Sequence, residues 1–200
     1  YLDDRGKYCD DFNWPDNHNR MSALYNQKIG PFKGYYTAGT IWYQGESNMV
    51  EAPIYARALE ILHKDWSETF GFTEFGETMP FIYTQLAPFY YNNTTNYSTP
   101  TTIMAYMAEA MSDYWQKAKD NGKTAQVTTY DLPLTHIRVG GHSGGAIHPS
   151  DKQPVAARLA TAAYNMVYDK GQAIYSAPVY KSMTVDEEKG SIFVTFDCVG

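Results

Sequence analysis

Residues 41–48 read Ile-Trp-Tyr-Gln-Gly-Glu-Ser-Asn, so an apolar and aromatic run ends abruptly in five small or polar residues. In an open α/β sheet, ligands bind and catalytic groups gather at the carboxyl ends of the strands. Gly45, placed between Gln44 and Glu46, lets the backbone come close to a bound molecule. The stretch therefore predicts a strand that leads into a functional loop, with an ordinary polar turn as the alternative.

Apolar residues recur along three later segments at successive spacings of 4, 3 and 4, the pattern of one helix face. These residues are Tyr55, Leu59, Leu62 and Trp66; Met107, Met111, Tyr114 and Ala118; and Val155, Leu159, Ala162 and Met166. We expect the helices to begin near Pro53, Thr101 and Ser150, and buried strands over residues 36–43, 80–86 and 125–130. This alternation predicts an α/β fold with a parallel sheet packed between helices.

Two local signals refine these elements. Gly39 is a weak point in the first expected strand, because glycine has no side chain to pack. Ser150 with Gln153 three residues later matches a capping box at the start of the last helix.

The pattern changes after Pro178. Two short β-like runs, 179–185 and 191–198, are joined by an acidic turn and predict a hairpin. We therefore expect residues 1–176 to form part of one α/β domain, and residues 177–200 to begin a β-rich accessory domain.

Composition excludes several classes of partner. The net charge is −6 and no basic patch stands out, which argues against nucleic acid. No apolar run approaches the length of a membrane span. Cys9 and Cys198, the only cysteines, are too few for a metal cluster and could pair with each other or with other chain. The chain starts at Tyr1 rather than Met, and we expect it to be part of a longer protein.

Three N-glycosylation sequons begin at Asn92, Asn93 and Asn96 within a loop-like stretch, where an acceptor should be exposed. Their density predicts a glycoprotein that is secreted or lysosomal.

His148 is the histidine best placed for chemistry. It closes a Gly-rich loop and directly precedes Pro149 and the last helix, so its backbone is fixed beside the sheet's carboxyl edge. A general base is one interpretation, and a neighbour of the helix start is the other. The remaining histidines are weaker candidates: His136 and His142 as bases, His63 as a packing or surface residue, and His18 with no obvious partner.

A hydrolase that uses such a base also needs a nucleophile and donors for an oxyanion. Ser47 lies in the right loop, whereas Gln44 and the Gly45 amide are groups that donate to an oxyanion. The carboxylate that orients the imidazole could be Glu46, Asp131 or Asp151, and spacing does not choose among them.

Two blocks about a hundred residues apart carry a family resemblance, namely Trp42–Asn48 and Ile147–Gln153. With the supporting segments Ala23–Asn26, Asp65-Trp66 and Pro80–Leu86, they resemble sialate O-acetylesterases of the SGNH-hydrolase superfamily. The resemblance covers roughly residues 20–175. It implies a flavodoxin-like parallel sheet, flanked by helices and incomplete at its N-terminal side.

The resemblance implies hydrolysis by a Ser–His pair that removes acetyl groups from sugar hydroxyls, typically on sialic acids, without a metal or organic cofactor. The family's nucleophilic Ser lies in an upstream Gly-Gln-Ser-Asn block that is absent from these 200 residues. Ser47 aligns with a later block, so an N-terminal segment or chain should supply the nucleophile, and the isolated fragment should be inactive.

By the same resemblance, His148 is the catalytic base and Gln44 an oxyanion donor. Gly45, Glu46 and Asn48 then shape the loop near the pocket. Many members carry an Asp two residues before the histidine, where this chain has Ala146. That departure keeps two alternatives open: an inactive carbohydrate-binding or structural module, and an acetylesterase for another polysaccharide.

Overall fold

The structure is a computed structural model that describes residues 22–87, 100–132, 151–170 and 178–197. The α-helices are α1 (Ala52–Thr69), α2 (Pro100–Ala118) and α3 (Gln153–Met166). The strands are β1 (Thr40–Trp42), β2 (Phe81–Thr84), β3 (Thr124–Val127), β4 (Val179–Asp186) and β5 (Ser191–Asp197). Short helical turns are η1 (Tyr25–Ile29), η2 (Gly30–Phe32), η3 (Glu46–Glu51), η4 (Phe72–Phe75) and η5 (Lys119–Asn121).

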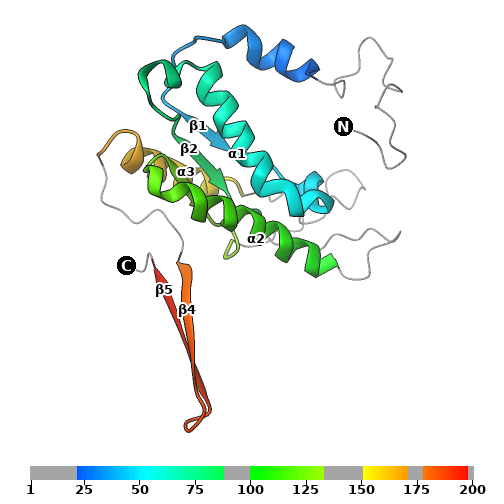
Figure 1. The fold of residues 1–200 in the computed structure, drawn as a ribbon, viewed down its shortest axis with the longest axis vertical. Helices are drawn as coiled ribbons and strands as arrows, with labels where there is room; N and C mark the ends of the chain where they lie inside the picture. The colour runs from blue at the N-terminus through cyan, green and yellow to red at the C-terminus, as the bar shows by residue number, and fades with distance from the viewer. Residues whose placement is uncertain (1–21, 88–99, 133–150, 171–177, 198–200) are drawn as a thin grey trace.

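Strands β1, β2 and β3 form a parallel sheet in that order. Trp42 pairs with Tyr83, and Thr84 with Val127, so the three strands end close together at one edge. Helices α1 and α2 lie side by side on one face and α3 covers the other (Figure 1). The predicted α/β class and the parallel sheet flanked by helices are confirmed.

A first core cluster fills the space between the sheet and helices α1 and α2. It is rich in aromatic rings and thioethers; its buried members are Met49, Ala52, Tyr55, Leu59, Met79, Phe81, Tyr83, Leu86, Met104, Met107, Ala110, Met111 and Tyr114. The apolar faces predicted for these two helices are confirmed, with Leu62, Trp66 and Ala118 at the rim of the cluster.

A second, smaller cluster lies between α3 and the sheet. Ile82, Ala125 and Val127 contribute the sheet side, and the predicted positions of α3 the helix side. Of those positions, Val155, Leu159 and Ala162 are buried, and Met166 packs at the margin. The two clusters together explain why β2, the central strand, is buried along its whole length.

The first strand is shorter and more exposed than predicted. It covers three residues instead of 36–43, and Tyr36 and Ile41 are 81% and 66% exposed. Trp42 faces the first cluster, so its neighbour Ile41 faces the opposite side of the sheet. Helix α3 packs on β2 and β3 there, which leaves the side chain of Ile41 uncovered.

Gly39 lies just before β1, so the predicted strand is interrupted at this residue, and glycine is also required there for strand pairing. Its φ is 152°, and a Cβ at this position would lie 2.7 Å from the Pro80 carbonyl oxygen. The next residue, Thr40, donates its N–H to that same oxygen at 2.8 Å. Glycine thus lets β1 approach the start of β2 closely enough to form the first bond of the ladder.

The start of α3 also differs from the prediction. A capping box beginning at Ser150 would place Gln153 at the third helical position, but the helix begins at Gln153, after Lys152. The Asp151 carboxylate instead accepts the Gln153 N–H at 3.2 Å. An acidic side chain satisfies one of the free amides at this helix terminus.

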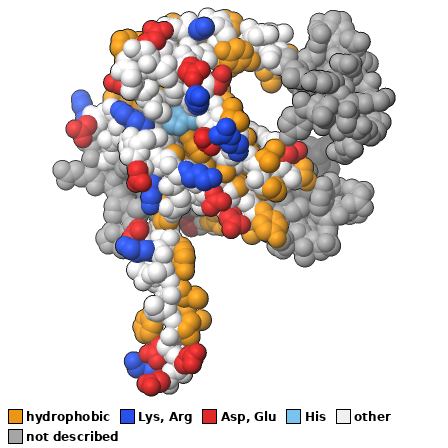
Figure 2. All heavy atoms as spheres, in the orientation of Figure 1, with side chains coloured by type: hydrophobic (Ala, Val, Ile, Leu, Met, Phe, Trp, Pro, Cys, Tyr) orange, Lys and Arg blue, Asp and Glu red, His pale blue; other side chains and the backbone are white. Residues whose placement is uncertain are grey.

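Strands β4 and β5 form the predicted antiparallel hairpin, which extends away from the α/β layers (Figure 1). Apolar side chains on it are exposed (Figure 2): Tyr180, Met183, Val185, Ile192, Phe193, Val194 and Phe196. The expected domain boundary at residues 176–177 lies outside the described residues. Among the helices of the described ranges, none is long and apolar enough to cross a membrane.

Candidate functional site

The carboxyl edge of the sheet carries the loop that the sequence marked as functional. Gly45 follows β1 there with a φ of 142°, a conformation that only glycine adopts easily. A Cβ at this position would lie 3.0 Å from the Tyr55 hydroxyl and 3.1 Å from both Leu86 Cδ1 and Met111 Cε. Space and backbone conformation therefore both require glycine. Within the described part of the chain, its amide N–H has no hydrogen-bond acceptor.

Tyr55 of α1 organises this loop. Its hydroxyl lies 2.8 Å from the Gln44 carbonyl oxygen and 2.9 Å from the Gln44 Oε1. The Gln44 Nε2 donates to Asn48 Oδ1 at 2.5 Å. From the other side, the Trp42 indole N–H approaches the Tyr55 oxygen at 3.5 Å. The predicted pocket residues Gln44 and Asn48 are thus joined to each other and to the buried helix.

The Tyr55 hydroxyl is held in its protonated form. Burial raises its pKa to about 12, the contact with Trp42 opposes that rise, and the negative charge of Glu46 adds to it. The same two influences, burial first and Glu46 second, raise the pKa of Tyr43. Glu46 is half-buried and has no hydrogen-bond or ion-pair partner among the residues described.

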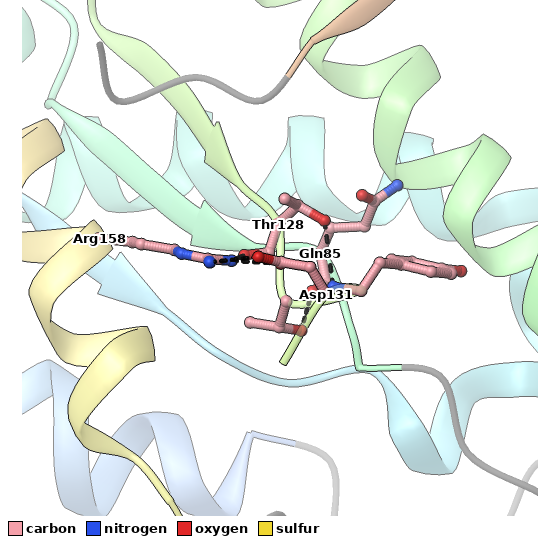
Figure 3. A network of polar contacts seen from close by, with 6 residues as sticks. Gln85, Thr128, Asp131 and Arg158 are labelled. Carbon is pink, nitrogen blue, oxygen red and sulfur yellow. Dashed lines mark hydrogen bonds and ion pairs between the residues drawn. The ribbon is translucent and has the colours of Figure 1, made fainter. Parts of the chain in front are cut away.

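A second polar network lies where β2 and β3 end (Figure 3). Arg158 of α3 forms a bidentate ion pair with Asp131, with N–O distances of 2.7 and 2.6 Å, and donates to the Thr128 carbonyl oxygen at 2.6 Å. Thr129 Oγ1 donates to the Gln85 carbonyl oxygen at 2.9 Å. The guanidinium lowers the pKa of Asp131 and the carboxylate raises the pKa of Arg158. This network fixes the chain that leaves β3.

One contact joins the two sequence blocks. The Lys152 ammonium lies 4.7 Å from the centre of the Tyr43 ring, so the segment before α3 meets the segment after β1. The Tyr43 ring also packs against the second core cluster, and its hydroxyl is buried with no partner in the described ranges. Residues 109 positions apart therefore share one edge of the sheet.

The structure describes some of the expected site residues and not others. Gln44, Gly45, Glu46 and Asn48 lie together at the carboxyl edge, and Ser47 beside them is exposed. The remaining residues named from the sequence lie outside the described residues: His148, His136, His142 and His18; Asn92, Asn93 and Asn96; Cys9 and Cys198; and Ala146. The roles assigned to them stay predictions.

His63 is a core residue, as the packing interpretation predicted. It is 5% exposed and stacks on Phe81 at 5.0 Å between ring centres. Its Nε2 lies 2.6 Å from the Met79 carbonyl oxygen, and its Nδ1 lies 2.6 Å from the Tyr114 hydroxyl. Burial lowers the pKa of this imidazole, with the bond to Met79 opposing the shift. The described ranges hold no cluster of His, Cys, Asp and Glu that could bind a metal ion.

Three residues of the site were not singled out from the sequence for a polar role. Tyr55 was assigned to an apolar helix face, which is correct for its ring but not for its hydroxyl. Arg158 and Lys152 gave no local signal, because their partners lie 27 and 109 residues away.

The parallel sheet, its flanking helices and the polar loops at its carboxyl edge form an arrangement consistent with an SGNH-like hydrolase fragment. Comparison with curated proteins gives a more particular likeness, to sialate O-acetylesterases. The mouse enzyme is 29% identical over an alignment of 188 residues that covers 89% of this chain and 32% of that protein. The rat enzyme is 28% identical over an alignment of 199 residues that covers 94% of this chain and 34% of that protein.

The human sialate O-acetylesterase is 27% identical over an alignment of 195 residues that covers 89% of this chain and 33% of the human protein. The chain therefore resembles these enzymes along about nine-tenths of its length, yet spans about a third of the length of the relatives it matches. No protein-family profile matches the chain.

Proposed function

We propose that this chain forms part of a serine esterase that removes O-acetyl groups from sugars, with sialic acids as the substrate class. The observation that carries the proposal is that the block Trp42–Asn48 and the segment leading into α3 meet at the carboxyl edge, through Lys152 and Tyr43. The likeness to sialate O-acetylesterases along most of the chain supports the reaction class.

In this proposal the nucleophilic serine comes from chain upstream of these residues, and His148 takes the proton from its hydroxyl. The serine oxygen attacks the acetyl carbonyl, and the carbonyl oxygen becomes an oxyanion. His148 then gives the proton to the departing sugar oxygen, and a water molecule, activated by the same imidazole, releases acetate.

The Gln44 Nε2 and the Gly45 amide are the proposed donors to the oxyanion. Gln44 Nε2 carries two protons, and one of them is directed at Asn48. The second proton and the Gly45 N–H have no acceptor among the residues that the structure describes and so remain available at the same loop. Two preorganised donors in a partly buried position are the arrangement that stabilises a developing negative charge.

Glu46 is the carboxylate that we propose orients the His148 imidazole. The two alternatives are engaged elsewhere: Asp131 by both nitrogens of Arg158, and Asp151 by the Gln153 amide. Glu46 alone among the three has no such partner in the described residues, and its charge already acts on Tyr43 and Tyr55.

The decisive experiment assays the natural full-length protein with p-nitrophenyl acetate and with 9-O-acetylated sialic acid. We expect hydrolysis of both, a loss of at least about 10³-fold on His148→Ala, and little change on His18→Ala, the matched control. Equal activity of the wild type and His148→Ala would refute the proposal. Binding of the acetylated sugar without hydrolysis would favour a carbohydrate-binding module. That alternative is suggested by Ala146, which stands where many members of the resembled family carry an Asp.

We also propose that the protein enters the secretory pathway, either to leave the cell or to reach lysosomes, because its sequons cluster at Asn92, Asn93 and Asn96. Treatment of the natural protein with peptide N-glycosidase should lower its mass. An unchanged mass would argue against this localisation.

A further inference from the structure

The Tyr55 hydroxyl faces more acceptors than it has protons. It carries one proton, and both Gln44 oxygens lie within 2.9 Å of it. The Trp42 indole N–H, which can only donate, approaches the lone pairs of the same oxygen at 3.5 Å. The hydroxyl proton is therefore directed toward Gln44, where the carbonyl oxygen and the Oε1 share it.

This contact sets which end of the Gln44 amide faces the loop. With Oε1 turned toward Tyr55, the Nε2 group is turned toward Asn48. Gln44 is a flexible residue whose side chain has three rotatable bonds, and restraining it costs side-chain entropy. The restraint here comes from a helix residue that is itself 5% exposed.

From this arrangement, and on the basis of the proposed function, we infer that Tyr55 is a positioning residue that holds the Gln44 amide ready to donate to the oxyanion. Tyr55 does not touch the reacting atoms and acts through Gln44. Its place on α1 links the catalytic loop to the first core cluster, and the loop lies so close to it that a Cβ added at Gly45 would be 3.0 Å from the Tyr55 hydroxyl.

The raised pKa of Tyr55 supports this role. Since burial raises the pKa of the Tyr55 hydroxyl to about 12, the hydroxyl remains protonated and able to donate throughout pH 5 to 9. The contribution of Tyr55 should consequently be the same from pH 5 to pH 9.

The test is Tyr55→Phe in the natural full-length protein. Phe keeps the ring in the core and removes the hydroxyl alone. We expect kcat for p-nitrophenyl acetate to fall about 10- to 100-fold with KM changed less than about threefold, because a misplaced oxyanion donor weakens only the transition state. The fall should be independent of pH.

Tyr114→Phe is the matched control. Tyr114 is a second buried tyrosine of the same cluster, and its hydroxyl bonds to His63 instead of the loop. It should lower the melting temperature as much as Tyr55→Phe and leave kcat unchanged. In a Gln44→Ala background, Tyr55→Phe should lower kcat no further, because residues that act as one unit are not additive.

A second readout needs no catalysis. In ¹⁵N-glutamine-labelled protein, exchange of the Gln44 side-chain amide protons should speed up about tenfold in Tyr55→Phe, toward the rate of exposed Gln116. An unchanged exchange rate, or an unchanged kcat in an active enzyme, overturns the role of Tyr55. An inactive wild type refutes the proposed function by itself, and the exchange rate then decides the Tyr55 question separately.

Discussion

Two polar networks, each containing a buried tyrosine, lie at opposite ends of the first core cluster. They differ in how many of their hydrogen-bonding groups have partners. At one end, His63 bridges Tyr114 and Met79. The Met79 carbonyl can only accept, so Nε2–H donates to it and Nδ1 accepts the Tyr114 proton. Every group of that network has a partner.

At the other end, Tyr55 holds Gln44, and one Nε2 proton and the Gly45 N–H remain unused among the described residues. We call the His63 network, in which every polar group has a partner, the closed network. It stabilises the fold. We call the Tyr55 network the open network, because two of its donors, the Gln44 Nε2 proton and the Gly45 N–H, lack acceptors among the described residues. Donors that are held in place but not satisfied can bind a transient negative charge. The difference supports the proposed placement of the oxyanion donors at the carboxyl edge by an argument that is independent of any relative.

Gly45→Ala should produce the largest effect, because it disrupts the open network at its most constrained point. A φ of 142° and contacts near 3 Å with three side chains predict a loss of about 2 to 4 kcal/mol in unfolding free energy. Urea denaturation measures it. Gly122→Ala, at a φ of 67° with nothing within 4 Å of the added carbon, should cost only about 1 to 2 kcal/mol. Equal losses would show that crowding around Gly45 is unimportant.

The closed network should respond to pH. Burial lowers the pKa of His63 in the folded state, so the unfolded state binds the proton more readily. Stability is then complete above the ordinary imidazole pKa of about 6.5 and declines as the pH falls below it, by about 1.4 kcal/mol for each unit that separates the two pKa values.

Urea denaturation from pH 7.5 to pH 5 tests this, with His63→Phe as the comparison. The variant should be less stable at pH 7.5, by about 2 kcal/mol, because it leaves the Met79 carbonyl and the Tyr114 hydroxyl without partners. Its stability should decline less toward pH 5 than that of the wild type. Parallel pH curves would show that His63 does not titrate within this range.

The smallest effect should come from the contact that joins the two sequence blocks. Lys152→Gln removes the cation from the Tyr43 ring and should cost about 0.5 to 1 kcal/mol in stability. Lys119→Gln removes a similar contact with Trp115, at 5.1 Å, far from the loop. Both should destabilise equally, but only Lys152→Gln should lower esterase kcat. Equal kcat values would mean that the Lys152 contact has no part in the site.

Local pattern was sufficient for most of the fold. The 4-3-4 spacing of residues such as Met107, Met111 and Tyr114 identified the buried faces of all three helices, and the hairpin was found from its two β-like runs. The errors came where a distant element decides the outcome. The first strand is shorter than predicted, and Ile41 is exposed because α3 does not cover β1.

The site residues likewise divide into those that the local sequence identified and those whose partners lie far along the chain. Gln44 and Gly45 were found because a polar loop after a strand is a local feature. Tyr55 was missed as a polar residue because its ring satisfies the apolar pattern of α1, and nothing nearby in the sequence indicates where its hydroxyl points. Long-range partners of this kind become visible only in three dimensions.

The first core cluster has a consequence for the protein's chemical durability. Five of its buried members are methionines: Met49, Met79, Met104, Met107 and Met111. Oxidation of a thioether gives a polar sulfoxide, which such a core cannot accommodate without repacking. Met79, Met107 and Met111 are fully shielded, so peroxide reaches them only when the layers separate. The rate at which these sulfurs are oxidised would therefore report how often α1 and α2 part from the sheet.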